Sequence, residues 1–269
     1  MPSYLDSLNE RDLATLADVV GSDPTELSAD LRRRPWAIHD LLASDDVFGV
    51  VMDRQAHPAR VVSPFLLFAV LVHRAAGELR QATYVNDWSG PRSRLPVFDV
   101  APLQEFVEDA GRTSFLAALL TSFAVPDPPL VPGNQLDLSG LALWLDQVLP
   151  ADRTALLRRL GDLALFSAGV FPDRTGSKPM HPVDAERLGR TVQMTAEEVL
   201  SLCDPVRISP GLDALDALGA RWYSAAVAEG GTPPVVADVA NRFRAARRVL
   251  NHLADTHLYK LQPGWNVAA

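Results

Sequence analysis

The residues best suited to acid–base chemistry in this chain are an aspartate and a histidine four positions apart. Asp53 and His57 occur in the string VMDRQAHP, and on a helix they would share one face. A carboxylate beside an imidazole ring is the arrangement found in general bases and around metal ligands. The alternative is structural, because Pro58 after His57 favours a helix end where the histidine contacts the last carbonyl groups. With His73 and Tyr84 as further polar lining, the pair predicts a pocket between helices.

The sequence contains no complete signature of a metal site, a nucleotide site or a nucleophile. HExxH, ExxH, GxxxxGK[ST] and GxGxxG are all absent from it. Ser167 has only the second glycine of the GxSxG pattern, and the single cysteine, Cys203, has no partner for a disulfide bond or a zinc site. We predict no catalytic residue, no metal and no cofactor. A metal site assembled from His57, His73 and distant carboxylates remains the alternative.

An irregular stretch at residues 83–100 is the best candidate for recognition. It contains Asp87, Trp88, Arg92 and Arg94 among turn residues. Tryptophan and arginine on a turn offer an apolar anchor and contacts to anions. In the alternative interpretation, Trp88 and Phe98 fill the core and the arginines are solvated. The same stretch predicts a short hairpin.

Asp162 stands alone among apolar residues in the string RRLGDLALFSAGVFP. The spacing around it predicts a helix buried nearly all round, where an unpaired carboxylate would be costly. Arginines one turn earlier are in reach, but the expected partners are Arg247 and Arg242, at the edges of the apolar stripe of the last helix. Arg248 is expected to point away from that stripe. The pattern therefore predicts a structural ion pair rather than a reactive acid.

Proline start signals place the helices that must position these residues. Asp23-Pro24, Ser63-Pro64, Ser209-Pro210 and Thr232-Pro233 each put a capping side chain before a proline at the first helical position. The apolar spacing between them has the helical period, without sustained alternation. We predict an all-α bundle of about ten to twelve helices, with at most a short hairpin near residues 83–100. The final helix is expected at Pro233–Tyr259, and residues 171–184 are expected to form a polar loop.

The string VPDPPLVPGNQ, at residues 125–135, interrupts the helical pattern with four prolines. Such a string separates two parts of a chain or crosses one continuous core. We predict a single helical domain at residues 4–262, in two halves, with a proline-rich seam at residues 125–135.

Composition excludes several classes of partner. A chain of 269 residues with 48% apolar residues can bury a large core, and its formal charge of −8 disfavours nucleic acid and anionic membranes. The arginine clusters at residues 32–34 and 242–248 are the weak alternative for nucleic acid. The longest apolar run is too short to cross a bilayer, and the first residues are too polar for a secretory signal. We expect a soluble cytoplasmic protein with a protein partner or a homo-oligomeric state, and without nucleic-acid or membrane partners.

Three strings resemble segments of an uncharacterised family of bacterial and archaeal helical proteins. They are YVNDWSGPRSRLPVFD, GDLALFSAGVFPDR and FRAARRVLNHLADTHL, the last two with the patterns GDxALFxxGxFPxR and ARRVLNxLxDxxL. Together they cover about a sixth of the chain. The resemblance implies a shared helical fold and transfers no catalytic residue.

The sequence therefore favours a non-catalytic helical scaffold or partner-binding protein. The alternative is an enzyme, or a protein that binds a small molecule or a metal in a pocket between helices. Whether the protein is an enzyme stays open at this point.

Overall fold

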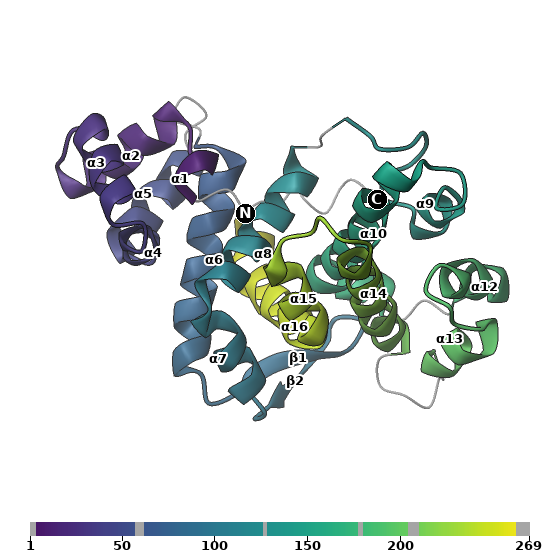
Figure 1. The fold of residues 1–269 in the computed structure, drawn as a ribbon. Helices are drawn as coiled ribbons and strands as arrows, with labels where there is room; N and C mark the ends of the chain where they lie inside the picture. Colours follow the sequence, from purple (N-terminus) through teal and green to yellow (C-terminus); the bar gives the residue numbers. More distant parts are fainter. Residues whose placement is uncertain (1–3, 57–61, 126–127, 177–179, 204–209, 262–269) are drawn as a thin grey trace. The chain divides into compact units, whose positions relative to one another are not determined.

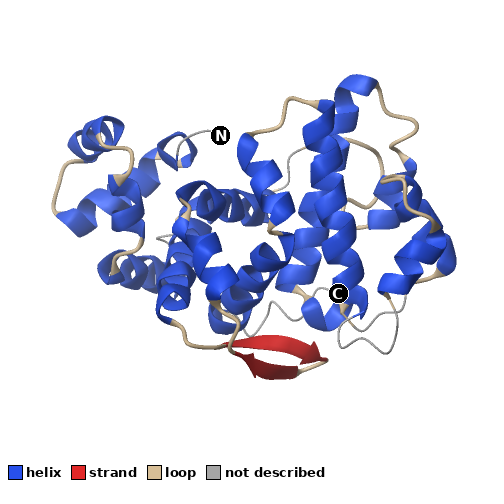
Figure 2. Cartoon of the chain, turned by 60° about the horizontal axis from the view of Figure 1, so that its bottom comes forward, coloured by secondary structure: helices blue, strands red, loops and turns tan. Residues whose placement is uncertain are grey.

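The computed structural model describes residues 4–56, 62–125, 128–176, 180–203 and 210–261. Within them all regular secondary structure is helical apart from one two-stranded hairpin (Figure 1, Figure 2), which confirms the predicted all-α fold. Among these residues, 12 helices have seven or more residues, as the sequence predicts. The chain divides into two compact units, residues 1–81 with 107–126 and residues 82–106 with 127–269. The single domain with its seam at residues 125–135 stays a prediction.

The first unit is built on the apolar helix α6 (Pro64–Gln81), which packs against α8 (Ala110–Ala124). The start of α6 is fixed by Asp12, a fully buried residue of α2, whose carboxylate accepts the backbone N–H of Ser63 at 3.0 Å and its hydroxyl at 2.6 Å. The shorter helices of this unit are α1 (Tyr4–Ser7), α2 (Glu10–Val20), α3 (Pro24–Arg33), α4 (Ala37–Leu42) and α5 (Asp45–Ala56).

The second unit has a core of three helices, α10 (Pro150–Val170), α14 (Pro210–Glu229) and α16 (Phe243–Leu253). The α10 and α14 helices lie side by side (Figure 1). Glycine makes this packing close, since a methyl group on Gly161 would lie 2.5 Å from the Tyr223 ring and one on Gly169 would lie 2.7 Å from Leu250. The other helices of this unit include α9 (Leu138–Leu143), α13 (Ala196–Leu202) and most of α7 (Ala101–Glu108).

The hairpin pairs β1 (Val85–Gly90) with β2 (Ser93–Val97) in antiparallel register, so a hairpin near residues 83–100 is confirmed. Trp88 lies opposite Arg94, and the register is irregular between Trp88 and Gly90. The turn needs left-handed backbone, with a φ of 57° at Arg92. The β1 strand contacts α16, so the hairpin packs on the helical core of this unit.

Two segments differ from the sequence-based expectation. Residues 171–184 contain α11 (Pro172–Thr175) and the start of α12 (Pro182–Arg190), because each segment has a proline at a first helical position. The expected last helix is divided at Arg242, where φ is −119° and ψ is 26°. It therefore forms α15 (Pro234–Asn241), α16, a π-helix (Ala254–Leu258) and α17 (Tyr259–Leu261).

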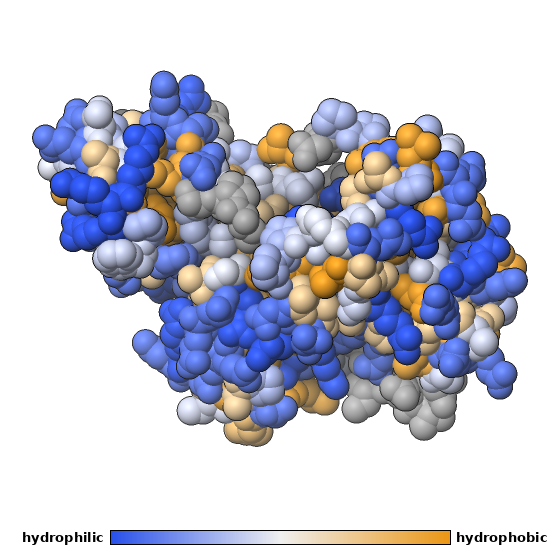
Figure 3. All heavy atoms as spheres, viewed as in Figure 1, coloured by the Kyte–Doolittle hydropathy of each residue, from blue (hydrophilic) through white to orange (hydrophobic). Residues whose placement is uncertain are grey.

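Hydrophilic residues predominate on the face shown in Figure 3, where hydrophobic residues occur in small groups. Among the helices that the structure describes, none has the length and apolar character needed to cross a membrane.

Candidate functional site

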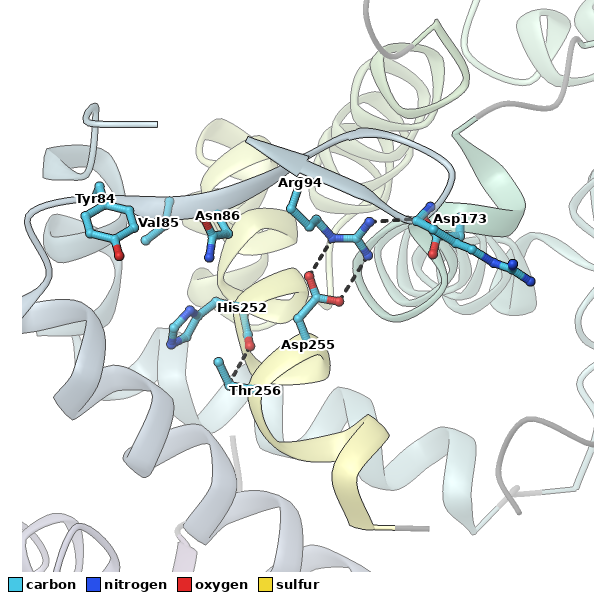
Figure 4. A pocket seen from close by; sticks show the side chains of 9 residues that line it. Tyr84, Val85, Asn86, Arg94, Asp173, His252, Asp255 and Thr256 are labelled. Carbon is cyan, nitrogen blue, oxygen red and sulfur yellow. Dashed lines mark hydrogen bonds and ion pairs between the residues drawn. The ribbon is translucent and has the colours of Figure 1, made fainter. Parts of the chain in front are cut away.

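The clearest candidate site is a pocket of about 530 Å³ in the second unit, which we call the Arg94 pocket. Its lining consists of Tyr84, Val85, Asn86, Arg92, Arg94, Asp173, His252, Asp255 and Thr256. These residues come from the hairpin and the segment before it, from α11, and from the junction of α16 with the π-helix. Figure 4 shows Arg94 between the hairpin and the helical segment that carries His252 and Asp255. Three segments distant in sequence therefore meet at this pocket.

Arg94 holds these segments together. Its Nε and one terminal nitrogen donate to the two carboxylate oxygens of Asp255 at 2.6 and 3.0 Å, and its other terminal nitrogen donates to Asp173 at 3.1 Å (Figure 4). Only 19% of the Arg94 side chain is exposed. Burial opposes its charge, but the hydrogen bonds to Asp255 and Asp173 outweigh burial and raise the pKa of Arg94. Arg94 is therefore a permanent cation between two acids.

Asp173 is the second residue on which several hydrogen bonds converge, and we call Arg94, Asp173 and Asp255 the Arg94 network. One of its oxygens accepts the Trp88 indole N–H at 2.7 Å, the backbone N–H of Arg92 at 3.2 Å and the Arg94 guanidinium. Burial would raise the pKa of Asp173, but the bonds from Trp88, Arg94 and Arg92 outweigh it and lower the pKa. Gly176 makes room for the indole, because a methyl group there would lie 2.6 Å from the Trp88 ring. The buried Trp88 thereby fixes the hairpin on α11.

A second ion pair fixes the hairpin on α16. Arg248 is buried, its Nε lies 2.8 Å from an Asp87 carboxylate oxygen, and a terminal nitrogen donates to the Asp99 carbonyl group at 3.2 Å. Arg248, which was expected to point away from the apolar stripe, is nevertheless buried, because the hairpin covers that side of α16. Asp87 and Trp88, predicted for recognition, therefore support the pocket without lining it.

The π-helix supplies polar residues to the lining of the pocket. Asp255 and Thr256 belong to this widened helical segment, and His252 precedes it by two residues. The Thr256 hydroxyl donates to the His252 carbonyl group at 2.5 Å. Burial, together with Asp255 and Asp173, raises the pKa of the neighbouring Tyr259 to about 12. Wide helical segments of this kind frequently occur at functional sites.

Asp162 lies outside this pocket, and its predicted ion pair is wrong. Its carboxylate accepts the Tyr223 hydroxyl at 2.7 Å and lies 3.8 Å from the Arg158 guanidinium. Burial raises the pKa of Asp162, while Arg158 and the Tyr223 hydrogen bond oppose the rise only in part. The physical reason is the position of α14, which packs along α10 and presents Tyr223 to Asp162.

The two predicted arginines have other partners. Arg247 donates to both carboxylate oxygens of Asp216 at 2.9 and 3.1 Å, and to the Asn251 side chain at 2.8 Å. Arg242 pairs with Glu105 at 2.6 Å and with Asp238 at 2.5 Å. The partners of Asp162 are thus on α10 and α14 rather than on the last helix, and its structural role stays a prediction.

The other predicted site residues do not meet in one pocket. Tyr84 and Arg92 line the Arg94 pocket, whereas Asp53 is exposed on α5 and His73 is buried in α6. His57 lies outside the described residues. Sequence reasoning missed Asn86, Asp173, His252, Asp255 and Thr256 as pocket residues. The only sequence feature that could have pointed to them is the family resemblance, because every residue of the pocket lining lies within the three strings that carry it.

Within the described ranges, no group of three or more histidine, cysteine, aspartate or glutamate residues could hold a metal ion. The chain matches no family model, and comparisons with curated proteins and with solved structures found no match. The resemblance to the uncharacterised helical family therefore stays an expectation.

Proposed function

We propose that the protein binds a small polar ligand without net charge in the Arg94 pocket. The volume of about 530 Å³ lies in the range of small-molecule sites. The positive charges of Arg92 and Arg94 balance the negative charges of Asp173 and Asp255, so the lining favours neither an anion nor a cation.

The lining supports a ring-shaped ligand with hydroxyl or amide groups, such as a nucleoside or a monosaccharide. Tyr84 is 50% exposed and offers an aromatic face. Asn86 offers an amide donor and acceptor, and neither its amide nor the Tyr84 hydroxyl makes a hydrogen bond to the part of the chain that the structure describes. These groups are available to orient a ligand.

The main support is the Arg94 network itself. Two acids from different segments converge on one arginine that is only 19% exposed. Burying such charges gives little net stability compared with apolar packing, so a network at a pocket suggests a role in holding the site in shape. The network preorganises the hairpin above the π-helix for binding.

A thermal-shift experiment with uridine, adenosine and glucose tests this proposal. We expect at least one of these compounds to raise the melting temperature of the unaltered protein, and of the control Leu95→Ala, because Leu95 is an exposed hairpin residue outside the lining. Asn86→Ala and Tyr84→Ala should lose the shift. The proposal fails if none of the compounds shifts the melting temperature, or if the shift survives in both pocket variants.

A scaffold role in the cytoplasm, as a homo-oligomer or with a protein partner, is the second proposal. The side chains of Leu95 and Phe98, which are 55% and 74% exposed beside the pocket, favour it because exposed apolar side chains are typical of interfaces. Multi-angle light scattering over a range of concentrations tests the homo-oligomer. A mass that stays monomeric would remove that form of the proposal.

A further inference from the structure

The first unit contains a second pocket, of about 380 Å³, which we call the Tyr4 pocket. Its apolar walls come from Leu5, Leu31, Pro35 and Ile38, and its polar lining consists of Tyr4, His39, Ser114, Asp6 and Arg32. It shares no lining residue with the Arg94 pocket. An apolar pocket with a few polar groups at one place favours a ligand with an apolar body and a polar head.

Tyr4 is the first polar group that points to such a ligand. The residue is only 5% exposed, and its buried hydroxyl makes no hydrogen bond of normal geometry, although the side chains of Thr113 and Ser114 lie close enough to affect its pKa. Leaving a buried hydroxyl without a partner is costly, so a ligand oxygen that accepts its proton would stabilise the site. Burial raises the pKa of Tyr4 by more than Thr113 and Ser114 lower it, which keeps this hydroxyl protonated and able to donate.

His39 and His73 form a hydrogen-bonded pair behind Tyr4. The distance between His39 Nδ1 and His73 Nε2 is 3.1 Å, and His73 Nδ1 lies 2.8 Å from the Ala69 carbonyl oxygen. The Tyr4 ring contacts both imidazole rings edge-on, at centroid distances of 5.1 and 5.5 Å. His39 therefore lines the pocket, and the buried His73 lies behind it without lining the pocket.

The hydrogen bonds assign the protons of this pair. A carbonyl oxygen only accepts, so His73 Nδ1 carries a proton. Burial lowers the pKa of His73 to about 4, so the ring is neutral near pH 7 and its Nε2 is an acceptor. His39 must then donate from Nδ1, which leaves Nε2 of a neutral His39 with a lone pair. His39 can take up a proton there while its bond to His73 persists.

The charged groups near His39 do not supply a fixed positive charge for a bound anion. Burial lowers the pKa of His39, and Asp40 opposes this effect only in part. Of the residues that line the pocket, the exposed Arg32 and the exposed Asp6 carry opposite charges, and the Arg80 guanidinium near His73 disfavours a positive charge on that ring. When a carboxylic acid binds, His39 can take up the proton of the acid or a proton from solution. The resulting imidazolium then supplies the positive charge that the bound carboxylate needs.

We propose that the Tyr4 pocket binds an apolar carboxylic acid, whose carboxylate is held by the Tyr4 hydroxyl and by a protonated His39. One proton passes from the acid or from solvent to His39 Nε2, and the resulting imidazolium donates to the carboxylate and to His73. The hydrocarbon chain lies against Leu31 and Ile38, which are buried walls of the pocket.

Isothermal titration calorimetry with hexanoate, hexan-1-ol and hexylamine tests the head group, because the three probes share one chain length. Near pH 7 we expect hexanoate to bind at least about tenfold more tightly than hexan-1-ol, in line with a hydrogen bond to a charged group. Titrations in phosphate and in Tris should reveal the uptake of about one proton per hexanoate. Equal binding of hexan-1-ol, no binding of any probe, or no proton uptake would overturn the proposal.

Substitutions of Tyr4 and His39 test whether hexanoate binding and proton uptake depend on these two residues. Tyr4→Phe should weaken hexanoate binding about tenfold, and His39→Gln should remove the proton uptake. Arg33→Gln is the matched control, since Arg33 is exposed on α3 and does not line the pocket. Circular dichroism checks that each variant folds. If His39→Gln does not fold, the nitrogen chemical shifts of the His39 ring in the unaltered protein decide the matter, because hexanoate should shift them to the values of an imidazolium.

Discussion

At the level of single residues, Arg94 joins the hairpin to α11 and to the π-helix through its bonds to Asp173 and Asp255. Arg94 was a recognition candidate, but its acids lie 79 and 161 positions away along the chain. No local spacing encodes such pairs, because they depend on how the hairpin packs on α11 and on the π-helix. Asp162 accepts a hydrogen bond from a tyrosine instead of the predicted arginines, and a search for opposite charges does not consider such a partner.

The Arg94 network should contribute measurably to stability. Arg94→Gln leaves Asp173 and Asp255 without their shared cation, and both acids are partly exposed, at 41% and 25%. We expect the free energy of unfolding in urea to fall by about 1–3 kcal/mol. Arg92→Gln is the control, since the Arg92 side chain is exposed, and its effect should stay within about 0.5 kcal/mol. Equal effects of the two substitutions would contradict the role of the network.

Asp162 should make the stability of the folded protein depend on pH in the direction opposite to that expected for a salt-bridged acid. In the unfolded chain it loses its proton near pH ~4, whereas burial raises its pKa in the folded state. The folded state binds more protons between these two values, so stability falls as pH rises through that window. Melting temperatures measured across it should show a steeper fall for the unaltered protein than for Asp162→Asn. A difference between the two proteins that is constant with pH would rule out this explanation.

At the level of elements, the sequence located most helices because their start signals are local. The helices α3, α6 and α14 begin at Pro24, Pro64 and Pro210, which the sequence marks as first helical positions. The start of α12 was missed because its cap is His181, a rare capping residue. The division at Arg242 was missed because neither proline nor glycine marks it. Its side chain is held between Asp238 and Glu105, and those contacts appear only in the folded chain.

Glycine positions test the packing of these elements. Gly161→Ala puts a methyl group 2.5 Å from the Tyr223 ring, so we expect a loss of about 1–3 kcal/mol in the free energy of unfolding despite the better helix propensity of alanine. Gly77→Ala in α6 is the matched control, because no atom lies within 4 Å of the added methyl group. It should stabilise the protein by about 0.5–1 kcal/mol. A neutral Gly161→Ala variant in chemical denaturation would mean that α10 and α14 pack less closely.

At the level of the whole molecule, the division into two compact units predicts which amides exchange faster after a given substitution. Every partner of Arg94 lies in the second unit, and both members of the His39 and His73 pair lie in the first. Local opening exposes amides to exchange within the cooperative unit that contains the change. The position of a substitution should therefore decide which amides respond.

We expect hydrogen exchange measured by mass spectrometry to separate the units. Arg94→Gln should speed exchange in the hairpin and in α16, and leave the amides of α2 and α6 at their original rates. His73→Gln should do the reverse, because the bonds it removes belong to α4 and α6. Exchange that rises equally in both units for both variants would show one cooperative structure, which is the single domain that the sequence predicts. The proline-rich seam would then cross a continuous core instead of separating two independently opening parts.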